Sequence, residues 1–401
     1  MENGDRISEL PSDILISIIS RLPMREATAT CILSTRWQHL HAYITHLNFP
    51  KFTYYSHIDY MNPYYAHTVN QVLNSYKGGR IKEFMLELHK CGKFNIEKWF
   101  EFALTRQAEI IHISLPGMVV HGLPNTNGLK CLKDLSLIDI QMTDQYFNFL
   151  VSNCLVLECV TIKCSDKLEN VSIVGPSQLK NLNLSFLSGV RSIVIRDAIS
   201  LVSLTCCEWR SGCSVQLSNI PKLTKLDLRD CRHNLTQVEF LAQMPSCIRD
   251  QLQLLRLSSD SFPSFPMYKY NLELLDDLSF QFANMKHLEL VLAMAIDPEC
   301  YYVPRYACRL AETCDSLEKL VIRFLPWVMM DMGEFECNAE PYNHPRCDLS
   351  QKYLEILGYS GSSSERELAV YVINNATSLQ KLILDGTCLK RPKRKRKSIN
   401  L

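Results

Sequence analysis

The sequence predicts a mixed α/β protein in which a small helical N-terminal domain precedes a solenoid of parallel strands. Two observations lead to this prediction. A short apolar pattern, Leu-x-x-Leu-x-Leu with conservative exchanges, recurs over most of the 401 residues. The first 45 residues lack that pattern and carry apolar residues at helical spacing instead. The repeat dominates the architecture, because each unit can bury its apolar face only against its neighbours.

The repeat is most regular in the middle of the chain, where copies from Leu157 to Leu223 start 22 residues apart, within the ~20–29 residues of leucine-rich repeats. The last two apolar positions alternate with polar ones, as in a strand with one buried face. About 15 residues then remain for one helix or irregular turn that leads to a parallel neighbour. We therefore expect a leucine-rich-repeat solenoid, a parallel β horseshoe. Clear copies begin at Leu132, Leu179, Leu223, Leu252, Leu317 and Leu379, and weaker copies at Ile81, Ile110, Leu157, Leu201, Met285 and Leu354.

Polar residues that flank the buried strand positions are expected on the concave face, which solenoids generally use for protein binding. For most of them the simpler interpretation is a solvated strand position. Aromatic insertions after residue 258 either offer further contacts or pack back onto the last repeats. The candidate target-binding residues are Lys225, Asp227, Arg229, Arg256, His287, Lys319, Arg323 and Trp327. Other expected members of the face are Asp134, Ser136, Asn181, Asn183, Glu289, Lys381 and Asp385.

The N-terminal domain is predicted to contain three short helices. Ser12 or Asp13 can cap the first helix, and Pro23 ends it. A second helix is expected over Arg25 to Cys31 and a third from about Ser34. Some forty residues cannot bury enough surface to be stable alone. The apolar face of the first helix therefore implies a partner protein that covers it.

These patterns divide the chain into four segments. We expect the helical domain over residues 1–45, a helical linker over 46–80, the repeats over 81–389 and a basic disordered tail over 390–401.

The basic tail separates the charges of the chain. Residues 390–397 hold seven of the 43 basic residues, which leaves 36 basic against 42 acidic residues elsewhere, a net charge of −6. An acidic body argues against phosphate binding by the repeats, so we expect no nucleic-acid partner. The tail is a candidate nuclear localisation signal, with a solvated terminus as the alternative, and we expect the protein in the nucleus and/or cytoplasm. The signal residues are Lys393, Arg394, Lys395, Arg396 and Lys397.

Other function classes find no support in the sequence. No apolar run approaches the ~20 residues of a membrane span, and no signal peptide is evident, so no membrane partner is expected. We expect the 17 cysteines to be reduced and packed as small hydrophobes. Nucleotide-binding, nucleophile-elbow and zinc-site spacings are missing, so neither catalytic residues nor a metal or cofactor is expected.

Both ends of the chain resemble a known family. The segments Leu10–Leu15, Ile18–Ile19, Leu22–Pro23 and Leu33–Leu40 resemble an F-box of the form that large plant families join to leucine-rich repeats. A second set of positions resembles the terminal block of plant F-box/LRR proteins of the FBD-like kind. These positions are His344, Leu354, Gly358, Tyr359, Gly361, Glu367, Leu368, Ala369, Tyr371, Ala376, Leu379 and Leu382.

The resemblance implies a non-catalytic substrate-recognition subunit of an SCF (Skp–cullin–F-box) ubiquitin ligase. The F-box would bind the Skp adaptor and, through it, the cullin, while the repeats hold a target protein for ubiquitination. One alternative is a leucine-rich-repeat scaffold that recruits no cullin. Another is a small-molecule pocket, as in plant hormone receptors of related design, although no basic cluster for an inositol phosphate is evident. By motif position, the adaptor-binding residues would be Leu10, Pro11, Ile14, Leu15, Ile18 and Trp37.

Overall fold

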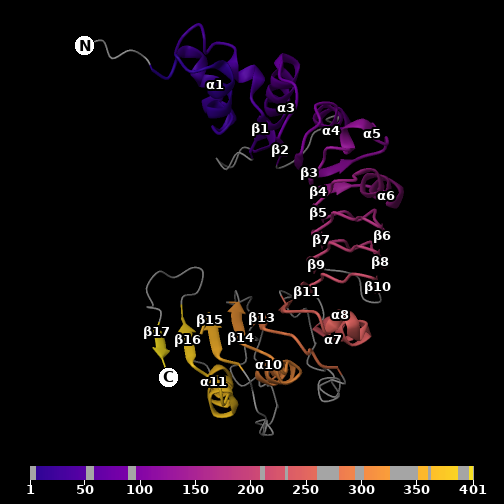
Figure 1. The fold of residues 1–401 in the computed structure, drawn as a ribbon, viewed down its shortest axis with the longest axis vertical. Helices are drawn as coiled ribbons and strands as arrows, with labels where there is room; N and C mark the ends of the chain where they lie inside the picture. Colours follow the sequence, from indigo (N-terminus) through magenta and orange to yellow (C-terminus); the bar gives the residue numbers. More distant parts are fainter. Residues whose placement is uncertain are drawn as a thin grey trace, which may run out of the picture. The chain divides into compact units, whose positions relative to one another are not determined.

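The computed structural model describes residues 6–50, 58–88, 96–207, 213–230, 234–259, 280–293, 302–325, 351–359, 363–386 and 397–400. The chain forms two compact units. Unit 1 comprises Met1–Ser200 and Gly212–Asn219, and unit 2 comprises Leu201–Ser211 and Ile220–Leu401. The predicted fold class, helices followed by a parallel-strand repeat solenoid, is confirmed (Figure 1). No helix among the described residues is long and apolar enough to cross a membrane.

Unit 1 begins with short helices and continues as a ladder of parallel strands in the order β1-β2-β3-β4-β5-β7. A separate parallel sheet has the order β10-β8-β6. Its helices are α1 (Ser12–Ile19), α2 (Met24–Ala29), η1 (Thr30–Ile32), η2 (Leu40–Tyr43), α3 (Ile58–Ser75), α4 (Ile96–Thr105), α5 (Thr126–Leu129) and α6 (Asp144–Asn153). Its strands are β1 (His46–Phe49), β2 (Glu83–Glu87), β3 (Ile110–Val119), β4 (Asp134–Gln141), β5 (Cys159–Lys163), β6 (Asn170–Val174), β7 (Asn181–Ser185), β8 (Ser192–Arg196) and β10 (Ser214–Ser218).

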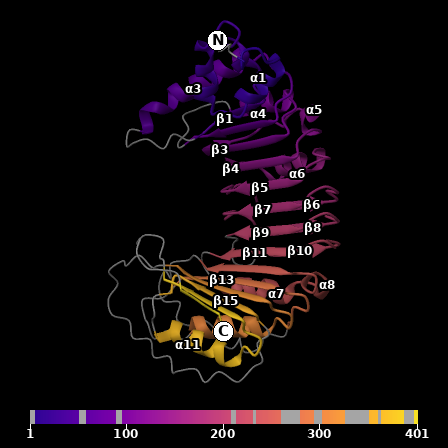
Figure 2. The ribbon, with the colours of Figure 1, turned by 60° about the vertical axis from the view of Figure 1, so that its left-hand side comes forward.

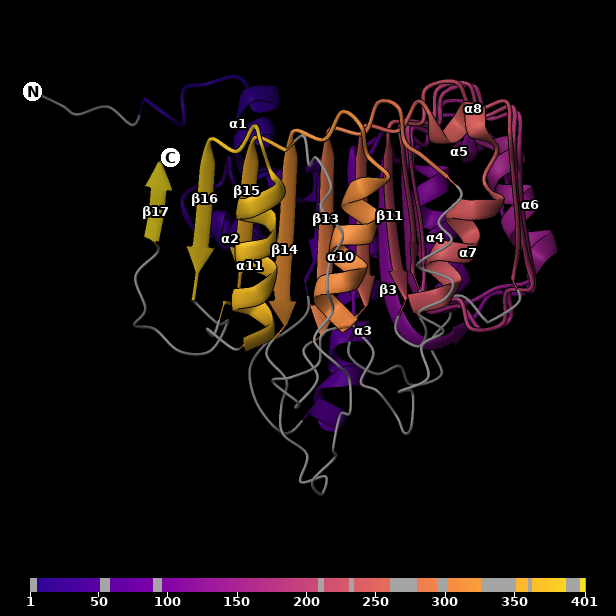
Figure 3. The same ribbon diagram turned by 90° about the horizontal axis from the view of Figure 1, so that it is seen from below.

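Unit 2 has parallel strands in the order β9-β11-β12-β13-β14-β15-β16, and β17 pairs antiparallel with β16. Helices α10 and α11 lie on one face of this sheet (Figure 3). The strands are β9 (Ser203–Cys207), β11 (Lys225–Asp230), β12 (Leu254–Ser259), β13 (His287–Ala293), β14 (Lys319–Leu325), β15 (Tyr353–Leu357), β16 (Lys381–Asp385) and β17 (Lys397–Asn400). The helices are α7 (Asn234–Gln243), α8 (Ser246–Arg249), α10 (Tyr302–Glu312) and α11 (Ser363–Asn375).

The repeat pattern maps onto the strands in a fixed register. In most copies the strand begins two residues after the leading apolar residue, as at Leu223 before β11. The next two apolar residues point into the core, and Leu226 and Leu228 are fully buried. Truncating one such leucine to alanine costs ~2–5 kcal/mol, because the packed neighbours cannot close the cavity. The stacked leucine pairs therefore hold the repeats together.

Two weaker copies were predicted in the wrong register. β3 aligns Ile111 and Ile113 with the buried pair of β4, so the leading position is Ala108 rather than Ile110. β15 aligns Leu354 with Leu320, so Leu354 is the second apolar position and the leading position is Gln351. Because Ala108 is small and Gln351 is polar, neither residue matched the leading apolar position of the pattern, and both strands were assigned the wrong register.

The connections in the 22-residue repeats differ from the helix or turn that we expected. β6 follows β5 and β8 follows β7, and these short strands pair with each other on the side opposite the main ladder (Figure 2). Their inward residues, including Val171 and Ile195, are fully buried. A 22-residue unit leaves too little chain for a helix and two turns, whereas the longer units carry α6, α10 or α11.

The N-terminal helices also differ in detail from the prediction. α1 has Pro11 at its N-cap position and no side-chain cap, where Ser12 or Asp13 was expected. The expected third helix is replaced by turns that end in η2. Its backbone bonds span three residues, as between the Trp37 N–H and the Ser34 carbonyl at 3.0 Å, which is the spacing of turns and 3₁₀ helices.

Segment 46–80 is part of the repeat ladder rather than a linker. It contains the expected helix, α3, but also strand β1, which pairs in parallel with β2. The helical domain packs directly on this first repeat: α2 contacts β1, and the Thr45 N–H donates to Ser20 Oγ at 2.9 Å. The Tyr76 hydroxyl donates to the Ile44 carbonyl at 3.1 Å. The N-terminal helical domain thus covers the first strand of the ladder.

The C-terminal tail was expected to be disordered throughout, but residues 397–400 form β17 along the edge of β16. Residues 393–396 of the candidate localisation signal lie outside the described residues. The aromatic insertion that carries Trp327 also lies outside them.

The buried Gln351 predicts a stabilising substitution. Its side chain is fully buried at a leading leucine position, and neither amide atom has a hydrogen-bond partner among the residues that the structure describes. An unpartnered buried amide costs ~1–3 kcal/mol. Gln351→Leu should therefore raise the thermal unfolding midpoint, measured by circular dichroism.

Gln237 provides the matched control in unit 2. It is equally buried, but its Nε2 donates to the carbonyls of Leu228 (3.2 Å) and Ser258 (2.8 Å). Gln237→Leu removes both of these hydrogen bonds and should lower the midpoint. If the thermal unfolding midpoint falls for both variants, the claim that the buried amide of Gln351 is unpartnered is wrong.

Candidate protein-interaction surfaces

Helix α1 presents two apolar faces of different character. Leu15 and Ile19, one turn apart, are fully buried against the domain, and α1 contacts η2. Ile14 and Ile18, also one turn apart, are 44% and 43% exposed. An eight-residue helix that keeps two β-branched aliphatic side chains in solvent is suited to contact with another protein.

The six residues predicted to bind the adaptor divide between surface and core. Ile14, Ile18 and Pro11 are exposed, and Leu10 is half-buried. Leu15 and Trp37 are buried, so in this fold they shape the domain from within and do not offer a contact surface. The sequence motif alone could not separate the two groups, because the exposed and the buried residues are both apolar.

Three further aliphatic side chains were missed as contact candidates. Ile32 ends η1 and is 83% exposed, and the adjacent Leu33 is 63% exposed. Ile7 is also exposed, ahead of α1. The available sequence signal was the apolar run Cys31-Ile32-Leu33 directly before polar Ser34. We define the exposed aliphatic set of the F-box as Ile7, Ile14, Ile18, Ile32 and Leu33.

Trp37 ties the N-terminal segment to this domain. Its indole Nε1–H donates to Ser8 Oγ at 2.8 Å, and the Arg36 guanidinium donates to the carbonyls of Ser8 and Leu10. These bonds hold the chain ahead of α1 against the turns that follow η1. Trp37 therefore helps to hold residues 6–10 against the domain.

The second candidate surface is the sheet face of unit 2 opposite α10 and α11, here called the open face. Seven of the eight predicted target-binding residues lie on strands of this sheet, and register places their side chains away from the buried leucine pairs. On β11, Arg229 and Asp227 pair with each other, with Nη2 and Oδ2 2.7 Å apart. Lys225 begins the same strand. The predicted members on β4 and β7 belong to unit 1: Asp134, Ser136, Asn181 and Asn183.

Arg256, Glu289 and Arg323 form one ion-pair group on three successive strands, β12, β13 and β14. The Nε atoms of Arg256 and Arg323 lie 3.7 Å and 3.8 Å from Glu289 Oε1. One carboxylate therefore faces two guanidinium groups.

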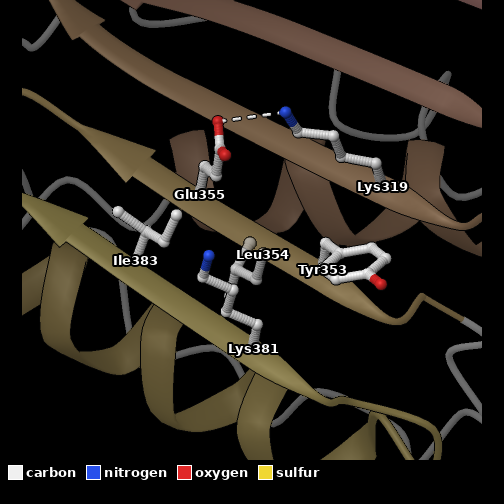
Figure 4. Close-up of a pocket in the computed structure, with 6 residues that line it drawn as sticks. All are labelled: Lys319, Tyr353, Leu354, Glu355, Lys381 and Ile383. Carbon is white, nitrogen blue, oxygen red and sulfur yellow. Dashed lines mark ion pairs between the residues drawn. The ribbon is translucent and has the colours of Figure 1, made fainter. Parts of the chain in front are cut away.

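A small cavity marks the next part of the open face. It has a volume of about 160 Å³ and is lined by Lys319, Tyr353, Leu354, Glu355, Lys381 and Ile383. Lys319 and Lys381 extend from the strands on either side of β15, and Lys319 Nζ pairs with Glu355 Oε2 at 3.2 Å (Figure 4). Tyr353 and Glu355 were missed because the predicted repeat began at Leu354, which removed them from the alignment of outward positions.

His287, at the start of β13, differs from its cationic neighbours. Burial lowers its pKa, and the adjacent Lys319 lowers it further. The imidazole is therefore neutral at pH 7, so the positive charge of the open face comes from arginine and lysine. Within the described residues, no group of three His, Cys, Asp or Glu side chains could hold a metal ion.

Both parts of the chain match known families. A family model described as "At1g61320/AtMIF1, LRR domain" matches residues 45–400, and one described as "F-box domain" matches residues 7–40. The chain belongs to the F-box/LRR family. The first match starts at β1, in agreement with a repeat ladder that includes residues 46–80.

Two relatives of this F-box/LRR protein from Arabidopsis thaliana match most of its length at low identity. Putative FBD-associated F-box protein At5g38570 is 24% identical over 388 residues, which cover 94% of this chain and 89% of the relative. F-box/FBD/LRR-repeat protein At4g26340 is 25% identical over 400 residues, which cover 94% and 91%. The family recognised from the two ends of the sequence is thereby confirmed.

The role of Trp37 can be tested by Trp37→Phe, which keeps the buried ring and removes the hydrogen bond to Ser8. We expect faster amide hydrogen exchange in residues 6–10, because a net contribution of ~0.5–1.5 kcal/mol is lost. Mass spectrometry of the peptides after exchange measures this.

Trp99→Phe is the matched control, since its indole Nε1–H donates to Asn70 Oδ1 at 2.8 Å in another part of unit 1. It should leave exchange in residues 6–10 unchanged. Equal exchange of that segment in the wild type and Trp37→Phe would refute the tethering role.

Proposed function

We propose that this F-box/LRR protein is the substrate-recognition subunit of an SCF-type ubiquitin ligase. F-box domains generally bind Skp-like adaptors, and F-box/LRR families are typically non-catalytic substrate receptors. The observation that carries the proposal is the exposed aliphatic set of the F-box. A free domain of this size would otherwise leave these side chains in water, and each buried on binding contributes up to ~1.5–3 kcal/mol.

In this mechanism the protein contributes binding and position rather than chemistry. The F-box covers β1 directly, so the adaptor surface and the first repeats of unit 1 belong to one packed body. A target held by the repeats would gain a high effective concentration at the ligase without any new catalytic contact. The partners in this proposal are the Skp adaptor, through it a cullin, and a target protein.

The adaptor surface can be tested by Ile14→Asp with Ile18→Asp. Co-expression with a plant Skp adaptor followed by size-exclusion chromatography should give a one-to-one complex for the wild type. The double variant should lose it, because two carboxylates would be buried without partners. Leu15 and Trp37 are left intact, so the fold of the domain is preserved.

Val174→Asp with Ile199→Asp is the matched control, since both residues are exposed aliphatics of unit 1 outside the F-box. This variant should keep the complex. Equal binding by the wild type and the Ile14/Ile18 variant would exclude the assigned surface. Failure of the wild type with several adaptors would favour a repeat scaffold that recruits no cullin.

The basic tail supports a separate proposal of nuclear import, based on its composition alone. A fluorescent protein fused to residues 390–401 should accumulate in plant nuclei. Replacing Lys393 to Lys397 by glutamine should abolish that accumulation. A fusion distributed like the unfused fluorescent protein would refute the signal.

A further inference from the structure

Two groups of side chains on the open face of unit 2 share a similar arrangement of charge. In each case a glutamate lies on a strand whose two neighbouring strands each carry a cation, and Glu289 pairs with both of its arginines, whereas Glu355 pairs with Lys319. The first group is Arg256 (β12), Glu289 (β13) and Arg323 (β14), and the second is Lys319 (β14), Glu355 (β15) and Lys381 (β16). In the second group, both lysines are in register with Tyr353.

Neither group is neutral, because each has two cations and one carboxylate. The Arg256 and Arg323 pairs with Glu289 are longer than hydrogen bonds, and the two buried Nε atoms have no hydrogen-bond partner. Lys381 has no ion-pair partner within the part of the chain that the structure describes. The side chains of Arg256 and Arg323 remain 31% and 40% exposed. Each group therefore has an excess positive charge, and the exposed parts of its cationic side chains lie within reach of a ligand.

This surplus stands out against the rest of the chain, whose net charge outside residues 390–397 is −6. Arginine and lysine supply this charge rather than His287, whose pKa is lowered by burial. A ligand that complements the face would carry separated negative charges that reach the exposed ends of the cations. A continuous phosphate backbone would also pass over Glu289 and Glu355, which would repel it.

We propose that the open face binds an acidic peptide segment through two carboxylates, one at each cation group. Charge-assisted and bidentate bonds to arginine make such pairs stronger than neutral hydrogen bonds. The proposal rests on the proposed function, since the segment would belong to the target protein. Tyr353, which is exposed beside the cavity, offers an apolar contact at the second group.

The spacing of the groups defines the segment further. Their central strands, β13 and β15, are two strand spacings apart, about 10 Å at ~4.8 Å per spacing. A polyproline II segment rises ~3.1 Å per residue with three residues per turn, so side chains three apart point the same way at ~9.3 Å. The peptide pattern that fits is therefore Asp-x-x-Asp in an extended segment.

The test uses three synthetic peptides with a neutral dye and fluorescence anisotropy at 50 mM NaCl. The probe is Gly-Pro-Asp-Pro-Pro-Asp-Pro-Gly, the neutral comparison replaces both aspartates by asparagine, and the spacing comparison is Gly-Pro-Pro-Asp-Asp-Pro-Pro-Gly. The full-length protein should bind the probe at least tenfold more tightly than the other two. Equal binding of the asparagine peptide would overturn the proposal, and equal binding of the adjacent-aspartate peptide would overturn the two-group arrangement.

Variants then locate the binding site. Arg256→Gln with Arg323→Gln, and separately Lys319→Gln with Lys381→Gln, should each weaken probe binding at least tenfold. Arg256→Lys with Arg323→Lys keeps the charge and should retain part of the affinity, which separates charge from folding. Lys133→Gln with Lys180→Gln removes two ion-paired lysines of unit 1 and should leave binding unchanged. An equal loss in this control would show general charge attraction and overturn the proposal.

The same variants distinguish this inference from the proposed function. All of them should retain the Skp complex, because the F-box is untouched. Probe binding without any adaptor complex would leave the acidic-peptide site standing and remove the ligase role. An adaptor complex without probe binding would leave the ligase role standing and remove the acidic-peptide site. Retention of a single-stranded oligonucleotide in preference to the peptide would assign the face to nucleic acid and overturn the inference.

Discussion

The architecture depends on the burial of two alternating apolar residues in every parallel strand. Each pair, such as Leu255 and Leu257, is buried in register with the equivalent pairs on the strands before and after it. This requirement fixes the register of the strands, since a shift by one residue would turn every leucine into solvent. It also fixes which side chains are left outward. The cation groups of the open face are thus set in place by the leucines that alternate with them.

The length of a repeat determines whether a short strand or a helix connects its main strand to the next one. Where a unit has 22 residues, a short strand returns the chain, and β6, β8 and β10 form a second sheet. Where units are longer, a helix fits, as with α10 and α11. The stacking rule is the same in both cases, so variation in the return segment leaves the main strands aligned.

Much of the fold could be predicted from sequence because the repeat is local and periodic. The predicted register was wrong in two copies, where Ala108 and Gln351 stand in place of the leading large apolar residue. The second error is the reason that Tyr353 and Glu355 were missed. Burial within the F-box could not be predicted either. Ile14 and Leu15 are neighbours of the same chemical type, and only the packing of α1 decides that Leu15 faces the core. Pairings between side chains on different strands, such as Arg323 with Glu289, depend on distances that a linear pattern does not contain.

A ladder of parallel strands has no inherent end, because its last strand presents the same unpaired backbone groups as any strand within it. In unit 2 the antiparallel strand β17 occupies that edge of β16. Reversal of direction makes this junction unlike any repeat-to-repeat contact. The edge of the sheet is now a four-residue strand that begins with Lys397, and a short edge strand that carries a lysine disfavours pairing with another copy of the chain. Residues 397–400 therefore cover the backbone groups of β16 with which a further repeat would otherwise pair.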